Sequence, residues 1–212
     1  VVTGISGGTL HMQKVFEGIG NVVTMAEDPL GRMWVGKSSG GIAVYDSELS
    51  VVKSFNPVLG ANNITSIIPL DGNHMLFSVF GDNIYKVDIH TFKTELMASG
   101  YKTAWESAIT LKKDRAGNIW IGTYGNGLLK YCPKSGLLLS YARCPGFASS
   151  DIIGIAEDKA GNMWLSSSYG IYRLNTRNNH VQGFFEKDGT EGNQQHEKSV
   201  LESRTGLVFF GG

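Results

Sequence analysis

Aspartate recurs in this 212-residue sequence at positions where a carboxylate could act as an acid or bind a cation. Asp28, Asp114 and Asp158 are each followed three residues later by glycine. A Ca²⁺ site needs a dense run of neighbouring oxygen ligands, and none of the three aspartates has one. Asp at the first position and Gly at the fourth are typical of a type I turn, because the carboxylate accepts nearby backbone N–H groups. The pattern therefore predicts turns and no metal site.

The histidines show no pattern of a catalytic or metal site. They lie at positions 11, 74, 90, 180 and 196, with no pair at metal-ligand spacing and no recognisable Ser/His/Asp set. The glycine-rich run 122–127 superficially resembles a phosphate-binding loop. It lies between two predicted strands, however, whereas a phosphate-binding loop leads into a helix. We therefore expect no catalytic residue and no cofactor.

Aromatic residues follow the turns at a fixed spacing. The series consists of Trp34, Phe77, Trp120, Trp164 and Phe209, at steps of 43, 43, 44 and 45 residues. A constant period of this length indicates a repeat architecture, in which each unit places its aromatic side chain at the same point. We expect these five side chains to form the structural core between neighbouring units.

Each repeat contains the strands that would position such a core. A short run rich in β-branched residues comes first, and then the turn, the aromatic strand, a glycine-bearing loop and two further strands. Four antiparallel strands in about 43 residues make the blade of a β-propeller. We expect an all-β fold with blades at about 21–60, 63–100, 107–145 and 151–187 and half-blades at 1–16 and 197–212, all in one propeller region.

The two half-blades look complementary. Residues 1–4 resemble the end of an aromatic strand and residues 10–16 the third and fourth strands, whereas 200–202 and 207–210 supply first and second strands. Open sheet edges favour aggregation, so a stable propeller has to cover them. Either the halves pair into a five-bladed ring, or the chain is part of a longer propeller.

One rim of the predicted propeller collects exposed aromatic residues. Because each strand reverses direction, the loops between second and third strands emerge on the same side as the connections between blades. This rim would gather Lys37, Phe80, Trp105, Tyr124 and Tyr169, beside several amide and hydroxyl groups. Such a surface suits stacking against sugar faces with polar contacts at their edges. We expect a ligand site here; the alternative is that these residues cap the rim or contact a neighbouring domain.

The overall charge and hydropathy exclude two classes of partner. Lys+Arg and Asp+Glu both total 19, so the net charge is zero and the basic surface of a nucleic-acid-binding protein is absent. No apolar stretch approaches the roughly 18 residues that cross a bilayer. We expect this chain neither to bind nucleic acid nor to insert into a membrane.

The segments 22–46, 109–131 and 152–175 share a Glu/Lys-Asp-x-x-Gly-x-x-Trp phrase and resemble the two-component-regulator propeller repeat. That repeat is characteristic of the extracytoplasmic sensor region of hybrid two-component sensor histidine kinases of Bacteroides-type bacteria. The resemblance implies a periplasmic location, as the extracytoplasmic part of an inner-membrane protein. It also implies a parent protein with another propeller, a following β-sandwich and a homodimeric state.

The same resemblance implies a role in signal transduction. The chain would recognise polysaccharide-derived oligosaccharides, or mediate contacts between domains or within the dimer, and would not itself be an enzyme. Two alternatives stay open. One is a propeller enzyme such as a lyase, which would need a histidine with acidic neighbours on one rim, and the other is a purely structural scaffold.

Overall fold

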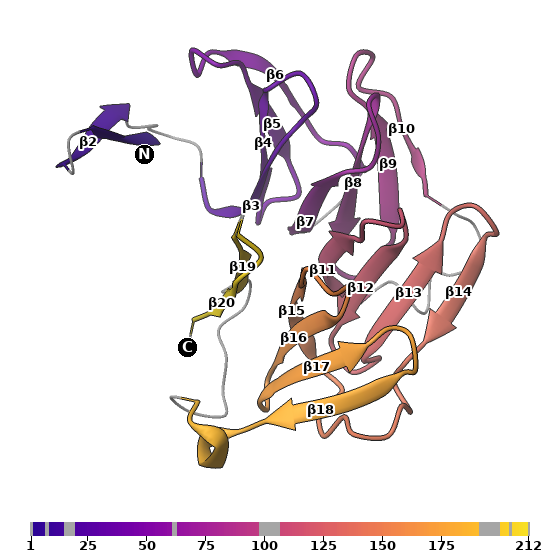
Figure 1. Cartoon of the computed structure of the whole chain (residues 1–212). Helices are drawn as coiled ribbons and strands as arrows, with labels where there is room; N and C mark the ends of the chain where they lie inside the picture. The colour runs from indigo at the N-terminus through magenta and orange to yellow at the C-terminus, as the bar shows by residue number, and fades with distance from the viewer. Residues whose placement is uncertain are drawn as a thin grey trace.

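The computed structural model describes residues 2–6, 9–14, 20–60, 63–97, 107–190, 200–203 and 205–211, the first two ranges as backbone only. These residues form short strands joined by turns, together with one short 3₁₀ helix, η1 (Glu186–Asp188). Figure 1 shows the sheets following one another in a curved row from β3 to β18. The all-β propeller fold predicted from the repeats is confirmed.

Four sheets of four antiparallel strands make up most of the fold, and each is an up-and-down meander. The first sheet consists of β3 (Val22–Glu27), β4 (Met33–Lys37), β5 (Ile42–Tyr45) and β6 (Val51–Phe55). The second consists of β7 (Ile64–Pro69), β8 (His74–Val79), β9 (Ile84–Asp88) and β10 (Thr94–Leu96). The third consists of β11 (Ala108–Lys113), β12 (Ile119–Thr123), β13 (Leu128–Cys132) and β14 (Leu137–Ser140). The fourth consists of β15 (Ile152–Glu157), β16 (Met163–Ser167), β17 (Ile171–Asn175) and β18 (His180–Phe184).

The first strands of successive sheets lie side by side, from β3 through β7 and β11 to β15. Short hydroxyl side chains join them: Thr24 Oγ1 accepts the Ile67 N–H at 3.3 Å, and Ser66 Oγ accepts the Leu111 N–H at 3.1 Å. The sheets therefore meet along their first strands, which is the arrangement of propeller blades around an axis.

The apolar core is divided into layers between neighbouring sheets. One layer contains Trp34 with Phe77 between the first and second sheets, and another contains Trp120 between the third and fourth. Packing in the second of these layers is tight, because a Cβ on Gly122 would meet the carbonyl oxygen of Ile152 in the next sheet. Each sheet is thus held by apolar contacts with the next sheet along the chain.

The ends of the chain form two hairpins. The strands β1 (Val2–Ser6) and β2 (Thr9–Lys14) pair with each other, as do β19 (Val200–Glu202) and β20 (Val208–Phe210). Each hairpin is a separate two-stranded sheet, so in this structure the two halves do not share a blade. In the described range 9–14 the chain is one continuous strand paired with β1, and residues 15 and 16 of the predicted third and fourth strands lie outside the described residues.

Candidate functional site

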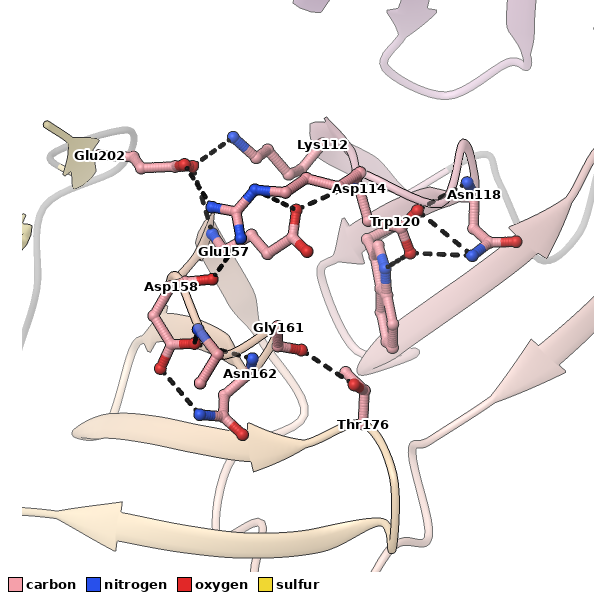
Figure 2. A network of polar contacts seen from close by, with 12 residues as sticks. Lys112, Asp114, Asn118, Trp120, Glu157, Asp158, Gly161, Asn162, Thr176 and Glu202 are labelled. Atoms are coloured by element: carbon pink, nitrogen blue, oxygen red, sulfur yellow. Dashed lines mark hydrogen bonds and ion pairs between the residues drawn. The ribbon is translucent and has the colours of Figure 1, made fainter. Parts of the chain in front are cut away.

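The turn between the first and second strands carries a recurrent bond between a carboxylate and an indole. In the third sheet, Asp114 Oδ1 accepts the Asn118 N–H at 2.8 Å, and Asp114 Oδ2 accepts Trp120 Nε1–H at 2.8 Å. The Asn118 side-chain amide donates to Oδ2 at 2.9 Å. Figure 2 shows the Asn118 and Trp120 side chains converging on the Asp114 carboxylate. The aspartate therefore shapes the turn and orients the buried tryptophan.

The same arrangement occurs in two other sheets. Asp28 Oδ2 accepts Trp34 Nε1–H at 2.8 Å and also bonds the Arg32 guanidinium at 2.7 Å. Asp158 Oδ2 accepts Trp164 Nε1–H at 2.9 Å. The turn role predicted for these aspartates is confirmed, because Oδ1 accepts backbone N–H groups in all three. The bond to tryptophan was missed, although its constant six-residue spacing was visible in the sequence.

The hydrogen bonds keep these carboxyl groups ionised. Burial by itself raises the pKa of Asp28, Asp114 and Asp158, but the bonds from the tryptophan, from the following turn residues and from the backbone outweigh it. The net pKa of each is lowered. A carboxylate that is ionised and satisfied by its own turn has a structural role, and it has no proton to donate in acid catalysis.

The predicted core aromatics differ in burial. Trp34, Phe77 and Trp120 are fully buried. Trp164 is half-buried, stacked on Phe184 with 5.5 Å between ring centroids. Phe209 is 53% exposed and so departs from the expected core position. Trp34 and Trp120 each pack against the next sheet along the chain, and in the described residues no sheet follows β20 to cover Phe209.

Strand register corrects the alignment of Phe77. In β12, Trp120 pairs with Lys112, two residues before Gly122, which pairs with Thr110 next to the bulge. The equivalent position of β8 is occupied by Leu76, which pairs with Ile68. Leu76 packs toward the third sheet, as a tryptophan would, whereas Phe77 packs back toward Trp34 in the first sheet. Adjacent residues of a strand point to opposite faces, so a one-residue error reverses the interface.

We call the surface formed by the loops 38–41, 80–83, 124–127 and 168–170 the loop rim. Backbone bonds tie these loops to the starts of first strands, as in Phe80 N–H to Asn63 O at 3.1 Å and Tyr124 N–H to Ser107 O at 3.0 Å. The structure brings Phe80 and Tyr124 together from neighbouring sheets, edge to face at 6.4 Å. Lys37 lies at the end of β4, half-buried, and Trp105 lies outside the described residues.

Tyr169 lies elsewhere on the loop rim, beside a pocket. Its ring is 5.5 Å from that of Phe185, and Lys187 Nζ lies 5.9 Å from the Phe185 centroid. These residues and Glu186 line a pocket of about 710 Å³. Tyr169 is 50% exposed. The pocket thus combines two aromatic rings with one cationic and one anionic side chain, and sequence reasoning missed the part contributed by η1.

Asp151 is a further loop-rim residue that sequence reasoning missed. Its Oδ1 accepts the Gly125 N–H at 2.8 Å, and its Oδ2 accepts the Ser168 hydroxyl at 3.1 Å. It therefore links the loop of the third sheet to the loop of the fourth. A polar residue directly before each first strand (Asn21, Asn63, Ser107 and Asp151) was the signal that could have indicated this position.

Groups suited to catalysis or metal binding are sparse in the described part of the chain. His74 Nδ1 lies 2.9 Å from Asp71 Oδ1, but the pair is local to one turn, where Asp71 also accepts the Asn73 N–H at 2.8 Å. The described residues contain no group of three or more His, Cys, Asp or Glu side chains arranged to hold a metal ion. Nor do they form any helix with the length and apolar character that crossing a membrane requires.

Two segments of the chain, residues 106–125 and 146–169, match the two component regulator propeller family. The first segment covers the turn of Asp114 and its indole bond, and the second covers the turn of Asp158. No curated protein matches the chain in sequence.

Solved structures resemble the chain over nearly its whole length. The extracellular domain of a B. thetaiotaomicron protein described as a hybrid two component system is 20% identical with a TM-score of 0.75, and the match covers 97% of this chain and 28% of that one. A second such domain from the same bacterium is 19% identical with a TM-score of 0.73, covering 94% and 27%. Virginiamycin B lyase from Staphylococcus aureus is 13% identical with a TM-score of 0.70, covering 96% and 74%.

At these identities the structural likeness shows the fold alone, and this chain spans less than a third of the two extracellular domains. The repeat match adds the family of the repeats themselves. The chain folds as a β-propeller, and two of its segments match the two component regulator propeller family.

Proposed function

We propose that this chain is the ligand-recognising propeller of a hybrid two-component sensor and that its loop rim binds an oligosaccharide derived from a polysaccharide. The repeat match and the two extracellular domains of similar fold support the sensor context. The single observation that carries the ligand site is the exposure of aromatic rings on this rim, with Tyr169 at 50% and Phe80 at 46%. Each exposed ring lies beside a second aromatic ring, Tyr169 beside Phe185 and Phe80 beside Tyr124, and exposed apolar surface of this kind is typical of binding sites.

The chemistry of the rim suits a sugar. The apolar C–H face of a pyranose packs against an aromatic ring, while its hydroxyl groups need donors and acceptors at the edges. The pocket beside Tyr169 provides the Phe185 ring together with the charged ends of Glu186 and Lys187. The Asp151 bonds to Gly125 and Ser168 hold the two neighbouring loops in place. Such preorganised loops reduce the entropy lost on binding.

The wider context belongs to the same proposal. The chain would lie in the periplasm, as the extracytoplasmic part of an inner-membrane histidine kinase that acts as a homodimer. Its other partners would be the remaining propeller and the following β-sandwich of the same sensor. The chain itself would carry out no reaction, and ligand binding would change its contacts with these neighbours.

Isothermal titration of the chain with a panel of polysaccharide-derived oligosaccharides tests the proposal. Truncating an aromatic residue at the centre of a binding site weakens affinity by at least about tenfold. We expect this loss for Tyr169→Ala, and near-native affinity for Tyr169→Phe, which keeps the ring. Leu30→Ala is the control, because Leu30 is 55% exposed in a turn on the opposite rim.

Three results would contradict the proposal. Equal affinity of the wild type and Tyr169→Ala would remove the loop rim as the sugar site. Binding of no oligosaccharide, together with a Tyr169-dependent association with the β-sandwich of the sensor, would favour the inter-domain role. Formation of an unsaturated sugar product would favour a lyase.

A further inference from the structure

A second pocket lies on the opposite rim, where the turns between first and second strands lie. It has a volume of about 560 Å³ and is lined by residues 68–72 and 112–115, Glu157 and Glu202. These residues come from the ends of the first strands of three successive sheets and from β19. The pocket therefore lies where the inner strands converge, away from the loop rim.

The carboxylate of Glu202 is held in this pocket by three donors. Lys112 Nζ lies 2.7 Å from Oε2, and Arg115 Nη2 lies 3.3 Å from Oε1. The backbone N–H of Glu157 completes the set, at 3.4 Å from Oε2. Figure 2 shows the Glu202 carboxylate reaching from its hairpin toward Lys112 and Glu157. Burial raises the pKa of Glu202, but the bonds from Lys112, from the Glu157 N–H and the charge of Arg115 lower it overall, so the group is ionised.

Arg115 is fixed by contacts that do not involve Glu202. Arg115 Nη1 donates to Asp158 O at 2.9 Å, and the Arg115 N–H donates to Glu157 Oε2 at 2.9 Å. The Glu157 carboxylate is buried and lies 4.0 Å from Arg115 Nε, so part of its negative charge is offset. Two cationic groups and a backbone N–H thus form an anion cradle on the third and fourth sheets, in which the Arg115 side chain is held independently of Glu202.

The hairpin that supplies Glu202 packs one face against the fourth sheet and exposes the other. Its strands have three residues each, and Leu201, Leu207 and Phe209 are 63%, 60% and 53% exposed. Trp164 contacts it through Phe210, with ring centroids 6.4 Å apart. The Glu202 contact is therefore one of several that attach the hairpin, together with Val200 over Gly154 and Phe210 beside Trp164.

We propose that Lys112, Arg115 and the Glu157 N–H form a carboxylate-binding site, which Glu202 fills from within the chain to latch the β19–β20 hairpin. A carboxylate-bearing ligand competes with Glu202 for the same three donors, and its binding releases the hairpin. The volume of the pocket leaves room for a ligand larger than the carboxylate alone. This site is independent of the oligosaccharide site on the loop rim.

Chemical rescue tests the site. In the full chain, Glu202→Ala empties the cradle, and we expect a melting temperature lower by about 2–4 °C. Sodium acetate should restore part of this loss, whereas sodium chloride at the same ionic strength should not. The double variant Lys112→Met/Glu202→Ala should not respond to acetate, because the principal donor is gone. An equal response to acetate and chloride, or an acetate response in the double variant, would overturn the proposal.

Hydrogen exchange gives a second readout that does not depend on Glu202→Ala being stable. In Glu202→Gln, which keeps the shape of the side chain and loses its charge, we expect the amides of β19 and β20 to exchange about tenfold faster than in the wild type. Amides of β11 and β12 should exchange at unchanged rates. Unchanged exchange in β19 and β20 would show that Glu202 does not latch the hairpin and would refute the proposal.

Discussion

Replacing Asp114 by alanine should cost far more stability than replacing an aspartate in an ordinary surface turn. Asp114 accepts bonds from Trp120 Nε1–H, from the Asn118 N–H and from the Asn118 side chain. Trp120 is fully buried, so its indole N–H would find no water in the variant. A buried donor left without a partner costs about 1–3 kcal/mol, and the loss of a second bond to a charged group adds about 1–2 kcal/mol. We expect Asp114→Ala to lower the free energy of unfolding by about 3 kcal/mol.

Asp46 provides the matched control. Its Oδ1 accepts the Glu48 N–H at 3.0 Å and the Ser50 N–H at 2.8 Å, in a turn at the surface with no bond to tryptophan. Water replaces the lost acceptor there, so Asp46→Ala should cost about 0.5–1 kcal/mol. Urea unfolding followed by circular dichroism and tryptophan fluorescence would measure both. If Asp114→Ala and Asp46→Ala lowered the free energy of unfolding by the same amount, the bond to the indole would not contribute the stability that we assign to it.

Three further predictions follow from the same contacts. In the folded protein, the pKa values of the three turn aspartates lie below the value of 3.8 that they have in the unfolded chain. The stability that these aspartates add is therefore fully present above pH 3.8 and is lost as the pH falls through the lower folded pKa values. Urea unfolding at neutral and strongly acidic pH measures this loss, and a stability that did not depend on pH would contradict the prediction. Gly122→Ala should lower the free energy of unfolding by about 2 kcal/mol or more, because the added Cβ meets the Ile152 carbonyl oxygen. Gly72→Ala is the control: open space surrounds Gly72, so the free energy of unfolding should change by less than about 1 kcal/mol. Similar thermal midpoints for the two variants would refute the packing argument. Trp34→Ala should cost about 3–5 kcal/mol and Phe209→Ala under about 1 kcal/mol in denaturant titrations, and a reversed order would show that burial was misassigned.

Local patterns in the sequence were sufficient to predict the repeated turns and strands. The Asp-x-x-Gly spacing is turn chemistry within four residues, and the short runs rich in β-branched residues are a property of single strands. The second repeat is difficult to align with the others, because it has Leu70 in place of the turn aspartate. The Leu70 N–H donates to His74 O at 2.9 Å, as the aspartate N–H does in the other turns. Without that marker the aromatic residue was aligned by type, and Phe77 was placed one position away from the true equivalent, Leu76.

Contacts between distant segments could not be read from local patterns. Glu202 reaches Lys112 across 90 residues of chain, and Asp151 joins two loops that belong to different sheets. Phe209 illustrates a different limit. Its place in the repeat was recognised, but the burial of a blade aromatic depends on the sheet that packs over it, which is a property of the neighbour and not of the residue.

The substitution of leucine for tryptophan at position 76 makes the junction between the second and third sheets chemically distinct. The other junctions described contain a carboxylate bonded to an indole, and each such carboxylate gains a proton in strong acid. The cluster around Leu76 includes Ile121, Leu129 and Tyr131, and contains no carboxylate bonded to an indole. Acid should therefore weaken the junctions that contain a carboxylate before it weakens the junction at Leu76. The second and third sheets should stay packed together after the neighbouring junctions have been weakened.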